Sequence, residues 1–171
     1  QVDGDSGTAM AKSLGVGTMG LADTFESLDP DIILLLGDRD EALAAALAGA
    51  HMNIPVAHIH GGDAMQGAVI DDSIRHAITK FAHLHFPASE QSARRIEKLG
   101  EEEYRITVAG APGLDDVLAG AYTTPEVIRN RYGIDGDETL TLVVQHPVTT
   151  QHEQAREQMA ATLDAVEATT E

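Results

Sequence analysis

The sequence predicts an α/β protein built on a parallel β-sheet with helices on both faces. Short apolar runs alternate with longer helical segments, which is the pattern of right-handed βαβ units. The clearest run, DIILLL at residues 31–36, is continuously apolar, as in strands that are buried on both faces of a parallel sheet. Polar residues follow several of these runs at their carboxyl ends, where open α/β sheets bind their ligands.

The expected elements follow one another with short connections. Residues 1–17 show no clear period and predict no element. The expected order is then a helix over 18–28, a strand over 31–36, a helix over 41–52, a strand over 54–59, a helix opened by Asp71 and Asp72, a strand over 84–87, a helix over 89–99, a strand over 105–109, helices over 114–121 and 125–132, a strand over 140–144 and a helix over 151–171. Ser89 and Gly100 supply the cap signals of the 89–99 helix. In the last helix Met159, Leu163 and Val166 are expected to point inward.

Composition restricts the class of protein. The chain has 171 residues, of which 28 are acidic and 11 are Lys or Arg, for a net charge of −17. This charge repels nucleic acid and anionic membranes, so neither is expected as a partner. The absence of cysteine excludes disulfides and thiolate metal sites. No apolar run reaches the ~18 residues of a transmembrane helix, and no signal peptide opens the chain, so we expect a cytoplasmic protein. We interpret the acidity as that of a protein from a high-salt cytoplasm, in preference to a protein that is simply acidic.

The stretch over residues 54–80 concentrates polar groups around a glycine turn. Its strand ends in His60 and is followed by Gly61-Gly62, which predicts room for a ligand to approach the backbone. Asp71 and Arg75 are four residues apart on the next helix and should share one face. Asp72 and His76 have the same spacing and are explained by an ordinary helical pair.

Three strand ends deliver polar side chains to one edge of the predicted sheet. Asp38 and Arg39 follow the first strand, His60 and Asp63 the second, and His146 the strand over 140–144. We therefore expect a site in which Asp38, Asp71 and Arg75 share one cavity, with His60 beside them.

Simpler explanations exist for some of these residues. Asp38 has the position of a helix cap, and His146 that of a turn histidine ordered by Pro147. His58 and His60 alternate along their strand and so point to opposite faces, with His60 nearer the carboxyl end. A metal site formed by His60, Asp63 and His146 is conceivable, but the tight spacing of a metalloprotease helix is missing, so no metal is expected.

These motifs resemble the hydrolysing UDP-N-acetylglucosamine 2-epimerases of sialic-acid-type sugar synthesis. The matching pieces are GDR at 37–39, NIPVAHIHGGD at 53–63, DDSIRHAITKFAHLHF at 71–86, VAGAPGLDD at 108–116 and QHPVTT at 145–150. DDSIRHAITK and HPVTT are specific, whereas GDR alone would be weak. The resemblance implies two Rossmann-like domains in the GT-B arrangement, with the active site between them. Residues 1–121 would belong to the first domain, 122–139 to a junction and 140–171 to the start of the second. The chain would then be a central portion, inactive by itself.

The resemblance also implies a mechanism and roles. A base removes the C2 proton of the sugar while UDP departs, and water adds to the resulting 2-acetamidoglucal to give N-acetylmannosamine. By position, Asp38, His60 and Asp71 match the acid–base residues of the family, and Arg75 and His146 match substrate and phosphate contacts. Arg39, Asp63 and Asp72 complete the expected substrate-binding set. Asp63 stands where Glu is usual. The loop over 64–68 departs from the common form of the family, so the resemblance leaves the sugar specificity open.

Two other functions stay open from the sequence. One is a non-hydrolysing epimerase or a relative that acts on another nucleotide-linked amino sugar. The other is a nucleotide-sugar-binding module without catalysis, because a fold does not determine function. A nucleotide sugar is the expected partner in all three cases, no cofactor is expected, and we expect a homo-oligomer.

Overall fold

The computed structural model describes residues 6–65, 69–136, 140–146 and 149–169. The chain divides into two compact units, Gln1–Pro112 and Gly113–Glu171. The expected junction over 122–139 falls within the second unit, and its last residues, 137–139, lie outside the described residues, as do 66–68 of the loop over 64–68 and Pro147.

The first unit is built on a parallel sheet whose three strands have the order β1-β2-β3. The strands are β1 (Ile33–Leu36), β2 (Val56–Ile59) and β3 (Leu84–Phe86). β1 pairs with β2 in parallel, with Ile33 opposite Val56, which confirms the adjacency predicted for these two apolar runs. The strand expected over 105–109 is reduced to a single parallel bridge between His85 and Ile106.

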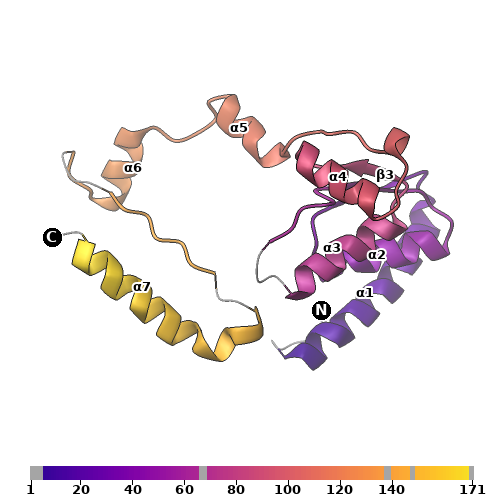
Figure 1. Ribbon diagram of the computed structural model, residues 1–171, viewed down its shortest axis with the longest axis horizontal. Coiled ribbons are helices and arrows are strands. Elements are labelled where there is room, and N and C mark those ends of the chain that lie inside the picture. Colours follow the sequence, from indigo (N-terminus) through magenta and orange to yellow (C-terminus); the bar gives the residue numbers. More distant parts are fainter. Residues whose placement is uncertain (1–5, 66–68, 137–139, 147–148, 170–171) are drawn as a thin grey trace. The chain divides into compact units, whose positions relative to one another are not determined.

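Among the described residues of the first unit, four α-helices accompany this sheet (Figure 1). They are α1 (Gly7–Leu28), α2 (Asp40–His51), α3 (Val69–Phe81) and α4 (Glu90–Lys98), and the 3₁₀ turn η1 (Glu103–Arg105) follows α4. The prediction that α1 begins at residue 18 is wrong, because the helix starts at Gly7, where Ser6 Oγ accepts a hydrogen bond of 3.2 Å from Ala9 N–H. Its glycine-rich first half lacks an apolar period, but α1 packs along α2 and passes close to Ala44 at Gly17.

The core lies between the sheet and α1, α2 and α3. Its buried members are Phe25, Ile33, Leu35, Ala45, Ala46, Ala48, Val56, Ile74, Ile78 and Ala82. The alanines of α2 let this helix lie close to the strands, and at Gly49 an added Cβ would come 2.6 Å from the Ile33 side chain. Ala46 and Val56 are fully buried at this contact.

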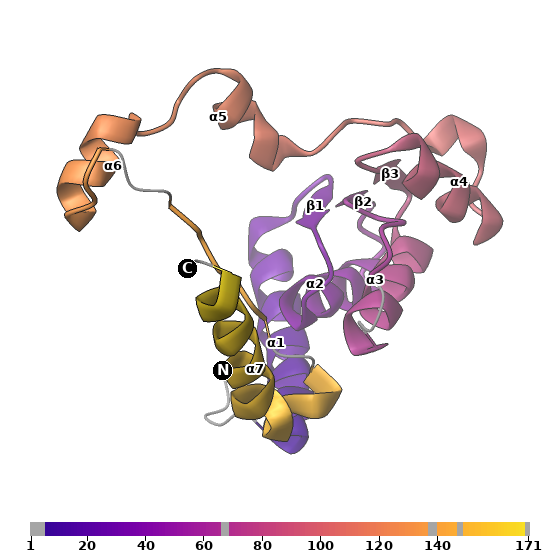
Figure 2. The same cartoon turned by 60° about the vertical axis from the view of Figure 1, so that its left-hand side comes forward.

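The two faces of the sheet differ in burial. α2 and α3 lie on the same side of the strands (Figure 2), as two right-handed crossovers in one direction require. On the other face, Leu34 and Leu36 are 62% and 61% exposed. The expectation that the first apolar run is buried on both faces is therefore wrong for these two leucines.

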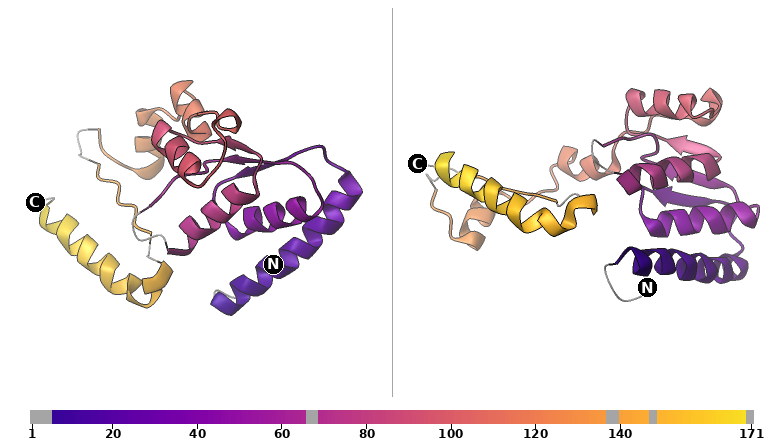
Figure 3. Two further views of the ribbon diagram at one scale, coloured as in Figure 1. Left: turned by 45° about the vertical axis from the view of Figure 1, so that its right-hand side comes forward. Right: turned by 60° about the horizontal axis from the view of Figure 1, so that its bottom comes forward.

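The second unit consists of helices and connecting segments in its described part (Figure 3). These helices are the 3₁₀ turns η2 (Pro112–Leu114, which begins at the last residue of the first unit) and η3 (Thr149–Gln154), and the helices α5 (Asp115–Leu118), α6 (Pro125–Tyr132) and α7 (Ala155–Thr169). α6 has its predicted bounds, whereas the helix expected over 114–121 is reduced to α5. Residues 140–144 form no strand among the described residues, because a strand needs a hydrogen-bonded neighbour. Leu163, expected to point inward from α7, is 50% exposed. None of the described helices is long and apolar enough to cross a bilayer.

Candidate active site

The turn after β2 is held in a conformation that depends on its glycines. His60 has a φ of 64° and Gly62 a φ of 78°, both in the left-handed region. A Cβ at Gly62 would lie 2.3 Å from the carbonyl oxygen of Ser92, and one at Gly61 would lie 2.9 Å from His58 Nδ1. The prediction that Gly61-Gly62 makes room for a ligand is therefore wrong: α4 and the His58 ring take up this space.

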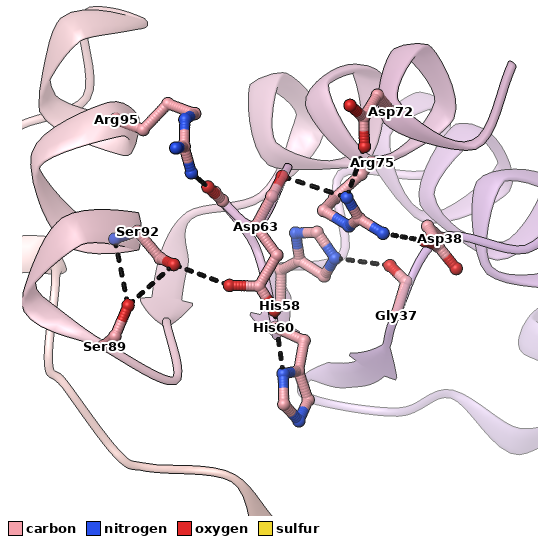
Figure 4. Close-up of polar contacts among 11 residues, drawn as sticks. Gly37, Asp38, His58, His60, Asp63, Asp72, Arg75, Ser89, Ser92 and Arg95 are labelled. Carbon is pink, nitrogen blue, oxygen red and sulfur yellow. Dashed lines mark hydrogen bonds and ion pairs between the residues drawn. The ribbon is translucent and has the colours of Figure 1, made fainter. Parts of the chain in front are cut away.

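Arg75 gathers the acidic residues that follow β1 and β2 (Figure 4). Its side chain is 6% exposed and its Nη2 donates to the carboxylate of Asp38. Its Nη1 donates to Asp72 Oδ1 at 2.6 Å and to the backbone oxygen of Asp63 at 2.9 Å. Such a buried guanidinium is stable only when its N–H groups find acceptors, and charge-assisted hydrogen bonds of this kind are the strong ones.

The helical partner of Arg75 differs from the predicted one. Asp72, three residues before Arg75, forms the ion pair, and it also accepts from the backbone N–H of Met65 at 3.3 Å. The i,i+3 and i,i+4 spacings are equally compatible with a helical pair, so the sequence could not choose between Asp71 and Asp72. Asp71 lies at the same end of α3 and is partly exposed. The explanation of Asp72 by a pair with His76 is wrong, because the Asp72 carboxylate pairs with Arg75 at 2.6 Å.

A second group of polar contacts links the turn to α4. Asp63 Oδ2 lies 3.1 Å from His60 Nδ1, and Ser92 Oγ donates to Asp63 Oδ1 at 2.6 Å. Arg95 donates to the carbonyl oxygen of Gly62. Asp63 thus contacts Arg75 through its backbone and His60 through its carboxylate, and connects the two groups.

His58 is a buried residue of β2 that stabilises the site through two hydrogen bonds. It is fully buried, its Nε2 lies 2.8 Å from the carbonyl oxygen of Gly37 and its Nδ1 lies 3.2 Å from Thr79 Oγ1. Burial lowers the pKa of His58 to about 4, so the ring is neutral at pH 7. It then donates to the Gly37 carbonyl and accepts from the Thr79 hydroxyl. His58 fixes the turn that carries Asp38.

Two of these supporting residues were not singled out from the sequence. Ser92 and Arg95 belong to a helix whose sequence shows only caps and an apolar face, so no local signal marks them. His58 was recognised as facing away from His60, and its position inside a buried strand was the available signal.

Two other predicted site residues are exposed. The Arg39 side chain is 81% exposed and pairs with Glu41 at 3.3 Å on the surface. His146 is exposed and belongs to the second unit. No group of three or more His, Asp or Glu residues in the described part of the chain is arranged to hold a metal ion.

Comparison with known proteins places the chain in a family. The sequence matches the UDP-N-acetylglucosamine 2-epimerase family over residues 1–171. The chain belongs to this family.

Two relatives with named activities are similar to the chain in sequence. The chain is 43% identical over 162 residues to a UDP-N,N'-diacetylbacillosamine 2-epimerase (hydrolyzing) of Legionella pneumophila, covering 95% of this chain and 42% of the relative. It is 39% identical to a UDP-N-acetylglucosamine 2-epimerase of Neisseria meningitidis, covering 74% of this chain and 33% of the relative. The chain therefore spans less than half the length of these relatives.

Solved structures agree on the fold. UDP-GlcNAc 2-epimerase from Neisseria meningitidis bound to UDP-GlcNAc superposes with a TM-score of 0.67 at 21% identity, covering 75% of this chain and 37% of that one. The enzyme from Methanocaldococcus jannaschii in complex with UDP-GlcNAc and UDP gives 0.67 at 20% identity, covering 78% and 37%. This likeness confirms the predicted fold class, an α/β Rossmann-like sheet of the kind found in these epimerases.

Proposed function

We propose that the protein to which this chain belongs is a hydrolysing 2-epimerase that converts UDP-N-acetylglucosamine to N-acetylmannosamine and UDP. The observation that carries the proposal is the convergence of Asp38, Asp72 and Asp63 on the buried guanidinium of Arg75, at the carboxyl ends of β1 and β2. Ligands of open α/β sheets bind at this edge, and carboxylate and imidazole groups are the usual acids and bases of proton transfer.

The proposed reaction has two steps. In the first, a base takes the C2 proton, the bond from C1 to the diphosphate breaks, and a C1–C2 double bond forms, giving 2-acetamidoglucal and UDP. In the second, a proton adds to C2 from the opposite face and the hydroxyl of water adds to C1. Asp38, His60 and Asp71 are the proposed acid–base residues. Two different groups must serve the two faces of C2, which fits a site with several carboxylates.

The geometry supports a positioning role for Arg75 in this reaction. Its Nη1 and Nη2 donate to three protein acceptors, so it holds Asp38 and Asp72 in place. His146 is proposed as a phosphate contact, since an imidazole can donate hydrogen bonds to phosphate oxygens. Arg39 is proposed as a further substrate contact, and assembly as a homo-oligomer stays a prediction.

The sugar has a second candidate, a UDP-linked 2,4-diacetamido sugar. Two relatives of 43% and 36% identity have names that specify hydrolysing 2-epimerases of diacetylbacillosamine nucleotides. The chemistry at C1 and C2 is the same for both sugars, so the acid–base residues do not discriminate between them. The sequence of the loop over 64–68, which departs from the common form of the family, leaves both sugars open.

Product analysis tests this proposal. The full-length protein is incubated with UDP-N-acetylglucosamine and, separately, with UDP-N,N'-diacetylbacillosamine. Free UDP with N-acetylmannosamine supports the first sugar, and free UDP with the corresponding free diacetamido sugar supports the second. A product that stays attached to UDP indicates a non-hydrolysing epimerase, and no turnover of either substrate indicates a binding module.

A matched pair of arginine variants links turnover to the site. Arg75→Met should lower kcat at least about 100-fold, because Asp38 and Asp72 lose their common partner. Arg94→Met removes an exposed arginine of α4 and serves as the control. Equal turnover of the two variants would contradict the placement of the site.

A further inference from the structure

We propose that Ser92 of α4 is a positioning residue for His60. Acting through Asp63, Ser92 holds the His60 imidazole as the Nδ1–H tautomer and leaves Nε2 as a proton acceptor. The chemical use of Nε2 rests on the proposed function, whereas the tautomer itself does not. The inference concerns a helix that neither the motifs nor the acidic cluster around Arg75 include.

The direction of each hydrogen bond follows from what its atoms can donate. An ionised carboxylate only accepts, so the single proton of the Ser92 hydroxyl goes to Asp63 Oδ1, 2.6 Å away. Ser92 Oγ, 3.0 Å from Ser89 Oγ, must then accept from the Ser89 hydroxyl. Ser89 Oγ in turn accepts from the backbone N–H of Ser92 at 3.2 Å, which is the N-cap bond of α4. Reversing any of these hydrogen bonds would leave one of the atoms without a partner.

The same reasoning fixes the histidine. Asp63 Oδ2 lies 3.1 Å from His60 Nδ1, and because the carboxylate cannot donate, Nδ1 must carry the proton. In a neutral imidazole the other nitrogen is then an acceptor. The His60 side chain is 27% exposed, so the ring is not sealed from solvent.

α4 can impose this arrangement because it is locked to the turn. Ser92 is 4% exposed, and its carbonyl oxygen lies so close to Gly62 that an added Cβ would approach to 2.3 Å. Arg95 donates to the Gly62 carbonyl oxygen, one turn of helix further on. The distance between α4 and Asp63 is therefore set by backbone contact, and Figure 4 shows the contacts from Ser89 to His60 in one view.

The tautomer can be measured on the 171-residue chain without substrate. Histidine labelled with ¹⁵N at both ring nitrogens, observed by long-range ¹H–¹⁵N correlation near pH 8, where histidine is neutral, distinguishes protonated from bare nitrogens. His60→Gln identifies the signals of this residue. The expected wild-type result is a protonated Nδ1 and a bare Nε2. A protonated Nε2 in the wild-type chain would overturn the proposal.

Variants separate positioning from packing. Asp63→Asn should reverse the tautomer, because an amide that accepts from Ser92 turns its NH₂ group toward His60 Nδ1. Ser92→Ala and the similarly sized Ser92→Cys should both give a mixture of tautomers. Ser89→Ala is the control, since it weakens the helix cap but leaves the Ser92 hydroxyl on Asp63. An unchanged Nδ1–H tautomer in both Ser92 variants, or in Asp63→Asn, would also overturn the proposal.

Turnover in the full-length protein completes the test. Ser92→Cys should lower kcat at least about tenfold while KM stays within about twofold, because the base is misplaced but the binding groups remain. If the tautomer is as expected and the wild-type enzyme does not act on a UDP-sugar, the proposed function fails and the positioning role stands. If the enzyme is active and the tautomer is Nε2–H, the positioning role alone fails.

Discussion

His58 shows how one buried side chain supports the candidate site. Its ring joins the Gly37 carbonyl oxygen, at the end of β1, to the Thr79 hydroxyl on α3. Asp38 follows Gly37 directly and Arg75 lies one helical turn before Thr79, so His58 sets the separation of an ion-paired acid and base. A neutral ring that donates from Nε2 to Gly37 accepts from the Thr79 hydroxyl at Nδ1, and this state agrees with the lowered pKa of about 4.

The pKa of His58 predicts a pH dependence of stability. The unfolded chain takes up a proton near 6.5, the ordinary pKa of histidine, whereas the folded protein does so at a pKa of about 4. Between these values the unfolded state binds more protons, so the free energy of unfolding falls as the pH decreases from about 6.5 toward 4. The expected loss between pH 7.5 and 5 is on the order of 2 kcal/mol, measured by urea unfolding. His85, whose pKa is also lowered by burial, adds to the effect in the same direction.

The matched variants for this prediction are His58→Gln and His51→Gln. His58→Gln should lose most of the pH dependence, whatever its stability at neutral pH. His51→Gln removes an exposed histidine of α2 and should keep the wild-type dependence, because His58 is still present. A pH dependence that is equal in the two variants would show that His58 does not control it.

At the scale of elements, the turn after β2 and helix α4 form one rigid contact. Gly62 and Gly100 both have a positive φ, of 78° and 92°. An added Cβ would meet the Ser92 carbonyl oxygen at 2.3 Å at Gly62, but nothing within 4 Å at Gly100. The two glycines therefore both have a positive φ, but only Gly62 lies against the backbone of α4.

This difference predicts the outcome of two alanine substitutions. Gly100→Ala should cost about 1–2 kcal/mol for the left-handed conformation alone. Gly62→Ala should cost a further ~1–3 kcal/mol, because the backbone of α4 has to shift. Thermal unfolding of both variants measures the difference. Equal losses would mean that the turn and α4 are not locked together, and would weaken the positioning role of Ser92.

The elements that the sequence predicts well are those with local signals. α4 has its cap residue Ser89 and a glycine just beyond its end, and α6 has Pro125 at its start and Gly133, with a φ of 66°, after its end. The first half of α1 was missed because its stability comes from packing against α2. The exposed face of β1 was missed because an apolar run does not say whether a second layer covers it.

The candidate site was predictable in its residues and less so in its contacts. Strand ends placed Asp38, His60 and Asp63 at one edge correctly, since this follows from parallel pairing. The choice of Asp72 over Asp71 as the partner of Arg75 depends on how α3 is rotated against the sheet. The Ser92 contact joins residues 29 positions apart, and no periodicity encodes it.

The whole molecule carries a charge of −17, which repels itself in the folded state. At an ionic strength of ~0.1 M the screening length is about 10 Å, and at ~1 M it is about 3 Å. We therefore expect the free energy of unfolding to rise with KCl over this range, as in a protein adapted to a salt-rich cytoplasm. Repeating the urea titrations in NaCl controls for ion-specific effects. Equal stability in dilute and molar salt would contradict the halophilic interpretation.

The proposed reaction replaces the C2 hydrogen of the sugar with a hydrogen from solvent. The C2 proton is lost to one group, and its replacement comes from another group on the opposite face, which has exchanged with solvent. Full-length protein is therefore incubated with UDP-N-acetylglucosamine in D₂O, and the products are analysed by NMR and mass spectrometry. We predict UDP and N-acetylmannosamine that carries one deuterium at C2. Free sugar that keeps its original C2 proton would contradict elimination and hydration at this site.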